Sequence, residues 1–404
     1  MKNRILIFKA GKLMLLFAVL LSGGCRKQYS EKEFLTEVSA NLGKIKSATY
    51  YSTATASAPG DTLKFSEPRT QFVKIFINPG DTLVGSGSLL FKGADTTEMT
   101  DFYDGIARGT VNREEQYVKI DSFRNDPYPF RLVHYPLYTK INEIIKYSLT
   151  TTDSISTVFK DYGDSLHFGL KIYDKHVYFH IRPIVIKNEY IPEDEISQFD
   201  IWFRKADGMP YRMRSRWHHT TFFEECHGAR FNTTRDTFFT ATDYFPEGFE
   251  IVQLRREPKP EGSTMTGMTA PDWTLRDTDE KLAGLKDLKS KVVMIQFTGI
   301  GCGPCHMSLP FLRQLAGEYD KNDLTLVSIE TWSNNLEGIR RYRTANNLTH
   351  LFLLSEEALT KAYGVKSVPM FFILDEKRVI RKVINGYSKD ATDSEIRAAI
   401  GALI

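Results

Sequence analysis

The spacing of apolar residues predicts a helix shortly after residue 30. Between residues 34 and 45, apolar side chains recur three and four positions apart, which is the period of an amphipathic helix. Ser30 and Glu33 precede this run with the spacing of a capping box, in which each side chain accepts a hydrogen bond from the other residue's backbone N–H. We therefore predict an amphipathic helix that is capped by Ser30.

From about Ala48 to Leu254 the pattern changes to short alternating or aromatic-rich runs, which are typical of β-strands. Asp207-Gly208 separates two such runs and predicts a hairpin, and the Pro-Gly-Asp triplets at 59–61 and 79–81 predict turns. A short helix is predicted at Ile141–Tyr147. The clearest strand-like runs are Gln71–Ile77, His176–Ile181, Phe199–Phe203 and Tyr211–Trp217.

After residue 270, apolar strand-like runs alternate with helical stretches, which is the pattern of an α/β domain. The predicted strands are Val292–Phe297, Leu324–Ile329, Phe371–Leu374 and Val379–Ile384, and the predicted helices are Leu309–Tyr319, Leu336–Ala345 and Glu356–Tyr363. Residues 256–269 are rich in Pro, Gly and small polar residues without periodicity, so we expect a linker there.

The N-terminus has the composition of an export signal. Four basic residues among the first twelve precede the apolar run Leu13–Leu21, which is too short for a comfortable membrane span, and small residues follow it. Cys25 comes directly after these small residues, which resembles the lipobox of bacterial lipoproteins, although Ser22 stands where that family usually has Leu. The resemblance implies cleavage after residue 24 and lipidation of Cys25. An ordinary secretory signal and an uncleaved anchor are the alternatives.

Composition places the rest of the chain among ordinary globular proteins. Its 404 residues are 42% hydrophobic and 25% charged, enough for two or three domains. Residues 1–24 carry four basic and no acidic side chains, so the mature chain is nearly neutral and shows no basic excess that would favour nucleic-acid binding. We expect a signal peptide at 1–24, a β-rich domain at 25–255, a linker at 256–269 and an α/β domain at 270–404.

The strongest chemical signal is Cys302-Gly303-Pro304-Cys305. It lies between a predicted buried strand and a predicted helix, so Cys302 should occupy the helix's first turn, where free backbone N–H groups and the helix dipole stabilise a thiolate. Two cysteines at this spacing can cycle between dithiol and disulfide. The chain has only two other cysteines, Cys25 and Cys226, so a network of structural disulfides is not expected.

From Ala270 to the C-terminus, the chain resembles thioredoxin-like reductases of the TlpA and ResA type. Besides the CGPC motif, the resemblance rests on three segments: Ala270–Leu275, Leu285–Val293 and Ala362–Asp375. It implies a thioredoxin fold and a thiol-disulfide oxidoreductase that needs no cofactor or metal. In that family Cys302 would be the nucleophile and Cys305 the resolving cysteine.

The same resemblance assigns the remaining site residues. Pro369 matches the family's cis-proline, which faces the CxxC and leaves the backbone of Val368 free to pair with an extended substrate segment; a trans proline opening a strand is the alternative. Gly303-Pro304 is the dipeptide of reducing thioredoxins, whose potential lies near roughly −270 mV, so we expect a reductase.

The expected partners also follow from the family. The substrate would be a disulfide-containing exported protein, and a membrane electron donor of the DsbD or CcdA kind would restore the dithiol. The expected location is the periplasm-facing side of the cell envelope, with attachment to the membrane through the lipid anchor.

Several positions depart from the family pattern. Gly301 stands where Trp is usual before the first cysteine, Gln296 where thioredoxin has a buried Asp, and Ser308 where ResA-type proteins have an acid. Proton transfer could then use water, Glu330 or His306. His306 could also lower the thiol pKa if it is protonated, or face solvent without a role.

Two other chemistries match parts of the same segment. Residues 302–306 fit the CxxCH haem-attachment pattern, but a strand-to-helix junction with a cis-proline segment downstream commits the sulfurs to a packed site. Peroxiredoxins have a similar lead-in, yet their peroxidatic cysteine follows Thr by three positions, and Gly299 occupies that place here. We therefore expect neither a haem protein nor a peroxidase.

The N-terminal domain gives weaker signals. The hairpin segment Ile201–Met213, together with the leading helix, resembles LolA-type lipoprotein-handling proteins, which implies an α+β domain: a helix plus an antiparallel half-barrel around an apolar cavity for acyl chains. A packed β-domain that serves as a spacer or docking surface is the alternative. His218, His219, Cys226 and His227 fit no standard zinc spacing, so we expect them to be structural.

Two functions from different classes therefore remain. The first is a thiol-disulfide oxidoreductase of the envelope. The second is a lipid- or protein-binding carrier whose thioredoxin-like domain is secondary or degenerate.

Overall fold

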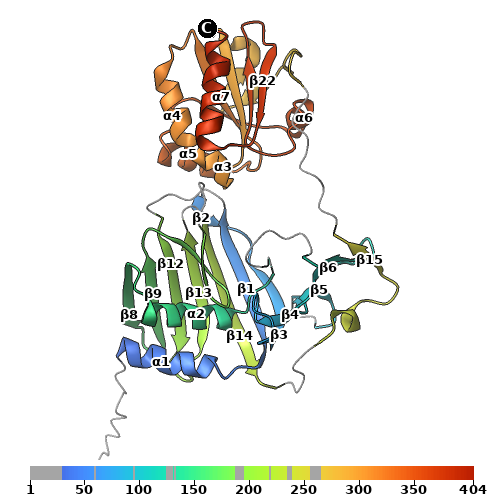
Figure 1. The fold of residues 1–404 in the computed structure, drawn as a ribbon, viewed down its shortest axis with the longest axis vertical. Helices are drawn as coiled ribbons and strands as arrows, with labels where there is room; N and C mark the ends of the chain where they lie inside the picture. The colour runs from blue at the N-terminus through green and yellow to red at the C-terminus, as the bar shows by residue number, and fades with distance from the viewer. Residues whose placement is uncertain are drawn as a thin grey trace, which may run out of the picture.

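The computed structural model describes residues 30–58, 61–93, 96–123, 131, 133–186, 195–217, 220–233, 239–254 and 265–404. The predicted signal peptide, Cys25 and linker residues 256–264 lie outside the described residues, as do the Pro59-Gly60 part of one predicted turn and the His218-His219 pair. Figure 1 shows one large sheet in the N-terminal half and a smaller sheet flanked by helices in the C-terminal third.

The N-terminal half is built on a 13-stranded sheet with the order β15-β7-β6-β5-β4-β3-β1-β14-β13-β12-β9-β8, to which β2 adds by pairing with β1. All neighbours are antiparallel except β15 and β7. The strands are β1 Ser47–Ala58, β2 Asp61–Phe65, β3 Arg69–Ile77, β4 Ser86–Lys92, β5 Met99–Tyr103, β6 Arg108–Asn112, β7 Tyr117–Asp121, β8 Ile155–Asp161, β9 Ser165–Ile172, β12 Ser197–Arg204, β13 Pro210–Trp217, β14 Thr220–Phe231 and β15 Glu250–Gln253. A separate hairpin joins β10 His176–Phe179 and β11 Pro183–Ile186, and a 3-10 turn spans Ala241–Tyr244.

Turn chemistry determines where strands reverse in this sheet. Gly208 of the predicted Asp207-Gly208 turn has a φ of 67°, which glycine adopts without steric cost, and β12 and β13 pair antiparallel on either side of it. The Asp81 side chain of the second Pro-Gly-Asp triplet accepts hydrogen bonds from the backbone N–H groups of Leu83 and Val84, between β3 and β4. The predictions of this hairpin and this turn are confirmed.

Two helices cover one face of the large sheet (Figure 1). Helix α1, Glu31–Leu42, has the predicted capping box between Ser30 and Glu33. Helix α2, Leu137–Thr150, contains the predicted Ile141–Tyr147 segment. Their buried apolar faces pack with aromatic and aliphatic residues of the strands into the largest core of this half. The coarse prediction of a largely β-sheet N-terminal domain is confirmed.

The C-terminal third has a five-stranded sheet in the order β20-β19-β18-β21-β22. The strands β18, β19 and β20 are parallel, whereas β21 and β22 run antiparallel, which is the central sheet of a thioredoxin-like fold. Helices α4, α5 and α7 pack on one face, and α6 with the β16–β17 hairpin packs on the other. The elements are β16 Thr274–Arg276, β17 Leu282–Gly284, a 3-10 turn Leu285–Asp287, β18 Val292–Thr298, α3 Gly303–Met307, α4 Leu309–Glu318, β19 Leu324–Glu330, α5 Leu336–Ala345, β20 Leu351–Leu354, α6 Glu357–Ala362, β21 Met370–Leu374, β22 Ile380–Asn385 and α7 Lys389–Gly401.

One predicted boundary is corrected. Residues 265–269 were expected to belong to the linker, but they pack against the C-terminal sheet. Gly267 donates its backbone N–H to the carbonyl of Ile380 at 2.7 Å, and Thr269 forms a β-bridge with Val379. Local composition favoured a linker, whereas pairing with a strand more than 100 residues away decides the structure.

Among the described residues, no helix is long and apolar enough to cross a membrane.

Candidate active site

The CGPC motif lies where strand β18 leads into helix α3. Every residue of β18 is buried, so the strand holds the turn after it against the core. Gly301 reverses the chain with a φ of 92°, a conformation that side chains strongly disfavour. Cys302 is the N-cap of α3, and its Sγ accepts a hydrogen bond from the backbone N–H of Cys305 at 3.1 Å. The sulfur therefore occupies the electropositive start of the helix.

Cys302 and Cys305 are joined by a disulfide, with Gly303 and Pro304 forming the turn between them. Cys302 keeps 5% of its surface exposed, whereas Cys305 is completely buried. The pair is therefore an oxidised dithiol in which only one sulfur borders the surface. Such a pair can accept two electrons and two protons by thiol–disulfide exchange.

The Val368–Pro369 peptide bond is cis and lies opposite the disulfide. The carbonyl oxygen of Val368 is 3.6 Å from Cys302 Sγ, although the two residues are 66 positions apart in the chain. Pro369 leads into β21, and its carbonyl accepts a hydrogen bond from the backbone N–H of Gly386 at 2.8 Å. The half-buried Val368 therefore borders the disulfide from a separate, fixed segment.

A chain of buried hydrogen bonds runs beneath α3. Ser328 Oγ donates to Gln296 Oε1 at 3.0 Å, and Gln296 Nε2 donates to Ser308 Oγ at 2.8 Å. Ser308 Oγ donates in turn to the carbonyl of Cys305 at 2.7 Å. Gln296, at the position of thioredoxin's buried Asp, and Ser308, at the position of the ResA-type acid, are therefore hydrogen-bonded to each other. These hydrogen bonds hold the backbone of Cys305 without the help of a carboxylate.

His350 closes the far end of this chain, because its Nε2 lies 2.8 Å from Ser328 Oγ. The hydroxyl hydrogen of Ser328 is used by Gln296, so His350 must donate through Nε2–H, which fixes its tautomer. Its Nδ1 is buried and has no hydrogen-bond partner among the described residues. Burial lowers the pKa of His350 to about 4, so the ring is neutral at pH 7.

Glu330 at the end of β19 is the buried acid of the site, with 1% of its surface exposed. Its carboxylate accepts three backbone hydrogen bonds of 2.9 Å, from Ile300, Trp332 and Ser333. Burial nevertheless raises its pKa to about 7. Since Ile300 precedes Cys302 by two residues, Glu330 ties the disulfide turn to the loop after β19.

Trp332 lies against the same turn, and it is a residue that the sequence reasoning missed. A Cβ on Gly299 would lie only 2.4 Å from its ring, so the indole packs directly on the glycine backbone. Trp332 is 61% exposed. The chain thus lacks the usual Trp at position 301 but places an exposed indole beside the turn from another loop. An isolated Trp three residues after the predicted strand Leu324–Ile329 was the available signal.

His306 is half-buried on α3, and its ring centroid lies 6.3 Å from that of Tyr342. Its backbone N–H donates to the carbonyl of Cys302 at 3.0 Å. Of the two side chains that sequence analysis offered for proton transfer, Glu330 has hydrogen bonds to the turn and His306 has an aromatic neighbour.

The second group of possible ligands, in β14, does not converge. Glu224 and Cys226 are buried, whereas Glu225 and His227 point to the other, exposed side of the strand. Glu224 pairs with Lys140 at 2.8 Å, and His227 stacks on Tyr51. In the described part of the chain, no three His, Cys, Asp or Glu side chains are close enough together to hold a metal ion.

The fold and the site together define a class: proteins of the thioredoxin fold that carry a dithiol–disulfide pair at the N-terminus of a helix. Comparison with known proteins agrees with this class. The Redoxin family model matches residues 265–400. The chain is 30% identical over 126 residues to the thioredoxin-like protein YneN of Bacillus subtilis, an alignment that covers 31% of this chain and 74% of YneN.

The chain also aligns with a second curated protein and with a solved structure. The chain is 27% identical over 121 residues to the thiol-disulfide oxidoreductase ResA of Geobacillus thermodenitrificans, covering 30% of this chain and 69% of ResA. A solved structure of a putative thiol:disulfide interchange protein DsbE from Chlorobium tepidum aligns at 23% identity and a TM-score of 0.31, over 34% of this chain and 98% of that one.

Through its C-terminal third, the chain belongs to the thioredoxin-like family. It is a thiol-disulfide oxidoreductase.

Proposed function

We propose that the chain reduces disulfides in exported proteins by dithiol–disulfide exchange at Cys302 and Cys305. The observation that carries this proposal is the placement of Cys302 Sγ, which accepts the Cys305 N–H at the start of α3 and borders the surface. A sulfur in this environment is stabilised as a thiolate, which is the attacking species in exchange.

The proposed cycle conserves electrons and protons. The Cys302 thiolate attacks one sulfur of a substrate disulfide, a mixed disulfide forms, and the released substrate thiolate takes up a proton. Cys305 then loses its proton and attacks Cys302 Sγ, which releases the second substrate thiol and leaves the Cys302–Cys305 disulfide seen in the structure. The substrate gains two electrons and two protons, and the enzyme must be reduced again.

Val368 and Pro369 are proposed to hold the substrate. The Val368 carbonyl lies 3.6 Å from Cys302 Sγ, so an extended segment pairing with the Val368 backbone would bring its own sulfur close to Cys302. Gly303 and Pro304 support the reducing direction, because this dipeptide is typical of reducing thioredoxins.

The cellular context of the proposal rests on the N-terminal sequence. The basic, apolar and small residues before Cys25 support export, and Cys25 is the proposed lipid attachment point for a periplasm-facing protein of the cell envelope. In that oxidising compartment the dithiol must be regenerated, so we propose a membrane electron donor of the DsbD or CcdA kind.

The test uses the full chain and a peptide that contains one disulfide. The pre-reduced wild-type protein should release two thiols per disulfide, whereas Cys302→Ser should lose at least about 99% of the activity because the nucleophile is absent. Cys305→Ser should accumulate a mixed disulfide with the peptide, detectable by mass spectrometry. Cys226→Ser is the matched control, since this free cysteine is buried in the other half of the chain. Equal turnover by Cys302→Ser and the wild type would refute the proposal.

A further inference from the structure

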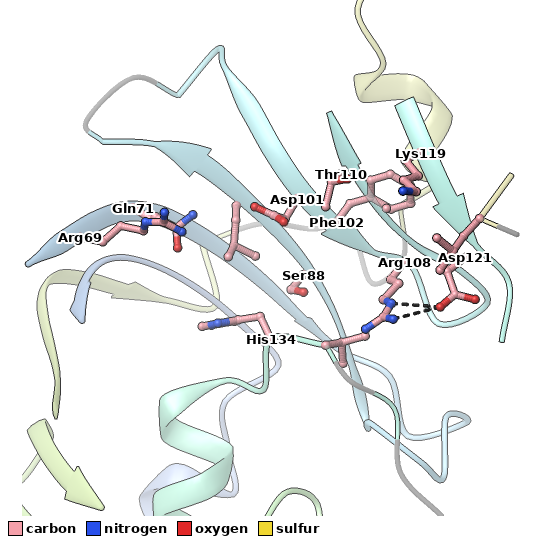
Figure 2. Close-up of a pocket in the computed structure, with 14 residues that line it drawn as sticks. Arg69, Gln71, Ser88, Asp101, Phe102, Arg108, Thr110, Lys119, Asp121 and His134 are labelled. Atoms are coloured by element: carbon pink, nitrogen blue, oxygen red, sulfur yellow. Dashed lines mark hydrogen bonds and ion pairs between the residues drawn. The ribbon is translucent and has the colours of Figure 1, made fainter. Parts of the chain in front are cut away.

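The N-terminal half contains a cavity that the redox chemistry does not use. It has two adjoining parts, of about 440 and about 460 Å³, whose linings share Arg69, Gln71, Val133 and His134. The first part borders strands β3 to β7 (Figure 2). The second lies between the large sheet, α2 and β10. The four shared residues therefore lie at the junction of both parts.

The second part has an aromatic wall. Its apolar lining includes Ile144, Tyr178, Phe199, Met213, Trp217 and Phe222. Tyr178 and Phe199 both contact Trp217, with ring centroids 5.0 and 6.0 Å away. Flat, rigid rings of this kind favour a flat aromatic body, because aromatic pairs gain from stacked and edge-to-face arrangements.

The charged groups of the cavity leave one cation without a partner. Lys140 is paired with Glu224 at 2.8 Å, and Arg108 with Asp121 at 3.0 Å. Asp101 and Lys119, on β5 and β7 in the first part, offset each other in charge. Arg69 is the remaining cation, and no ion pair joins it to any other residue in the described part of the chain.

His134 supplies a second unused polar group. Its Nε2 is buried and has no hydrogen-bond partner among the described residues, which is a costly arrangement unless a ligand completes it. Burial lowers the pKa of His134 to about 4, so the ring adds no charge at pH 7. Figure 2 shows Arg69, Gln71 and His134 around the same side of the cavity, away from the Arg108–Asp121 pair.

We propose that this cavity binds a small aromatic monocarboxylate, with the carboxylate held by Arg69, Gln71 and His134 and the ring against the wall formed by Tyr178, Phe199, Trp217 and Phe222. One excess positive charge matches one carboxylate. A guanidinium can hold both oxygens of that group in its planar fork, and the aromatic residues line the same part of the cavity as Arg69, Gln71 and His134. The site lies on the large sheet and is separate from the Cys302–Cys305 pair.

The experiment is a binding titration of the purified full-length protein with 2-naphthoate, followed by calorimetry. The neutral isostere 2-naphthamide is the matched ligand control. We expect 2-naphthoate to bind at least about tenfold more tightly than the amide, because the amide gives up the charge-assisted bonds to Arg69. Arg69→Gln should weaken 2-naphthoate binding at least about tenfold and abolish the preference over the amide.

Two further variants keep the test specific. Arg69→Lys retains the charge and should restore part of the preference for the carboxylate. Lys171→Gln removes an exposed cation from β9 in the same sheet and should leave binding unchanged. Cys302→Ser should also bind 2-naphthoate normally, so that failure here and failure of the redox function are distinguishable. Since Arg69 is exposed at the cavity mouth, the Arg69 variants should fold.

Any of four results would overturn the proposal. The first is the absence of 2-naphthoate binding at millimolar concentration. The second is equal affinity for the acid and the amide, and the third is equal affinity of wild type and Arg69→Gln. The fourth is tighter binding of decanoate than of 2-naphthoate with no dependence on Arg69, which would identify an acyl-chain cavity instead.

Discussion

Glu330 links the chemistry of the dithiol to the loop after β19. Three backbone N–H groups bind its carboxylate, yet burial raises its pKa to about 7. In the reduced protein, the Cys302 thiolate would lie on the turn to which this carboxylate is hydrogen-bonded. The bond comes from the backbone N–H of Ile300, two residues before Cys302. Ionisation of Glu330 should therefore disfavour the thiolate at pH values above about 7.

The corresponding prediction concerns the pH profile of Cys302 alkylation. In the reduced wild type, the rate with iodoacetamide should show an additional inflection near pH 7. Glu330→Gln should remove this inflection and raise the thiolate fraction above pH 7. Glu356→Gln, at an exposed acid in the same third of the chain, is the control. Superimposable profiles of wild type and Glu330→Gln would show that Glu330 does not act on the sulfur.

Gly299 shows how a glycine can be required by a neighbouring side chain. Its Cβ position is occupied by the ring of Trp332, 2.4 Å away. Gly299→Ala should therefore destabilise the protein by about 1–3 kcal/mol, since the added methyl displaces the indole. In the Trp332→Ala background the same change should cost much less. A double-mutant cycle of chemical denaturation measures this coupling, and additive effects would contradict the packing.

At the scale of elements, β18, α3 and β19 are joined into one unit by the buried hydrogen bonds that run from His350 to Cys305. At Gln296 and Ser308 the sequence departs from the family pattern and offers no acid for proton transfer. The structure shows instead that these residues anchor the backbone of Cys305. His350 and Ser328 could not be assigned from sequence, because their link to Gln296 depends on the pairing of three strands.

The pH dependence of stability tests this unit. The folded protein holds His350 neutral with a pKa of about 4. As the pH falls, the unfolded chain therefore protonates this histidine at a higher pH than the folded protein does. The stabilising contribution is full above pH 6.5 and is lost as the pH falls towards 4. Relative to His350→Gln, the wild type should lose about 2 kcal/mol between pH 7 and pH 4.5.

Urea denaturation at both pH values measures this difference. Comparison at equal pH cancels the contribution of Glu330, whose raised pKa acts in the opposite direction: stability falls as the pH rises from about 4.5 to 7. His227→Gln, which changes an exposed histidine on β14, is the control. A parallel response of wild type and His350→Gln would contradict the buried, neutral ring.

At the scale of the whole molecule, the sequence was informative where structure is local. The strand and helix periods after residue 270, the CGPC junction and the Asp207-Gly208 hairpin depend on neighbouring residues and were predictable. The order of the large sheet was not, because it pairs distant segments: Ser52 lies opposite Cys226, and β15 joins β7 in parallel. The contacts of Trp332 and His350 were missed for the same reason.

The reduction potential of the Cys302–Cys305 pair tests the proposed reductase most directly. The purified protein would be equilibrated with dithiothreitol buffers, and the thiols counted by alkylation and mass spectrometry. We predict a value near or below that of thioredoxin, roughly −270 mV, so that the dithiol can reduce protein disulfides. A value close to roughly −120 mV, as in strongly oxidising members of the fold, would contradict the reductase and assign the site to disulfide formation.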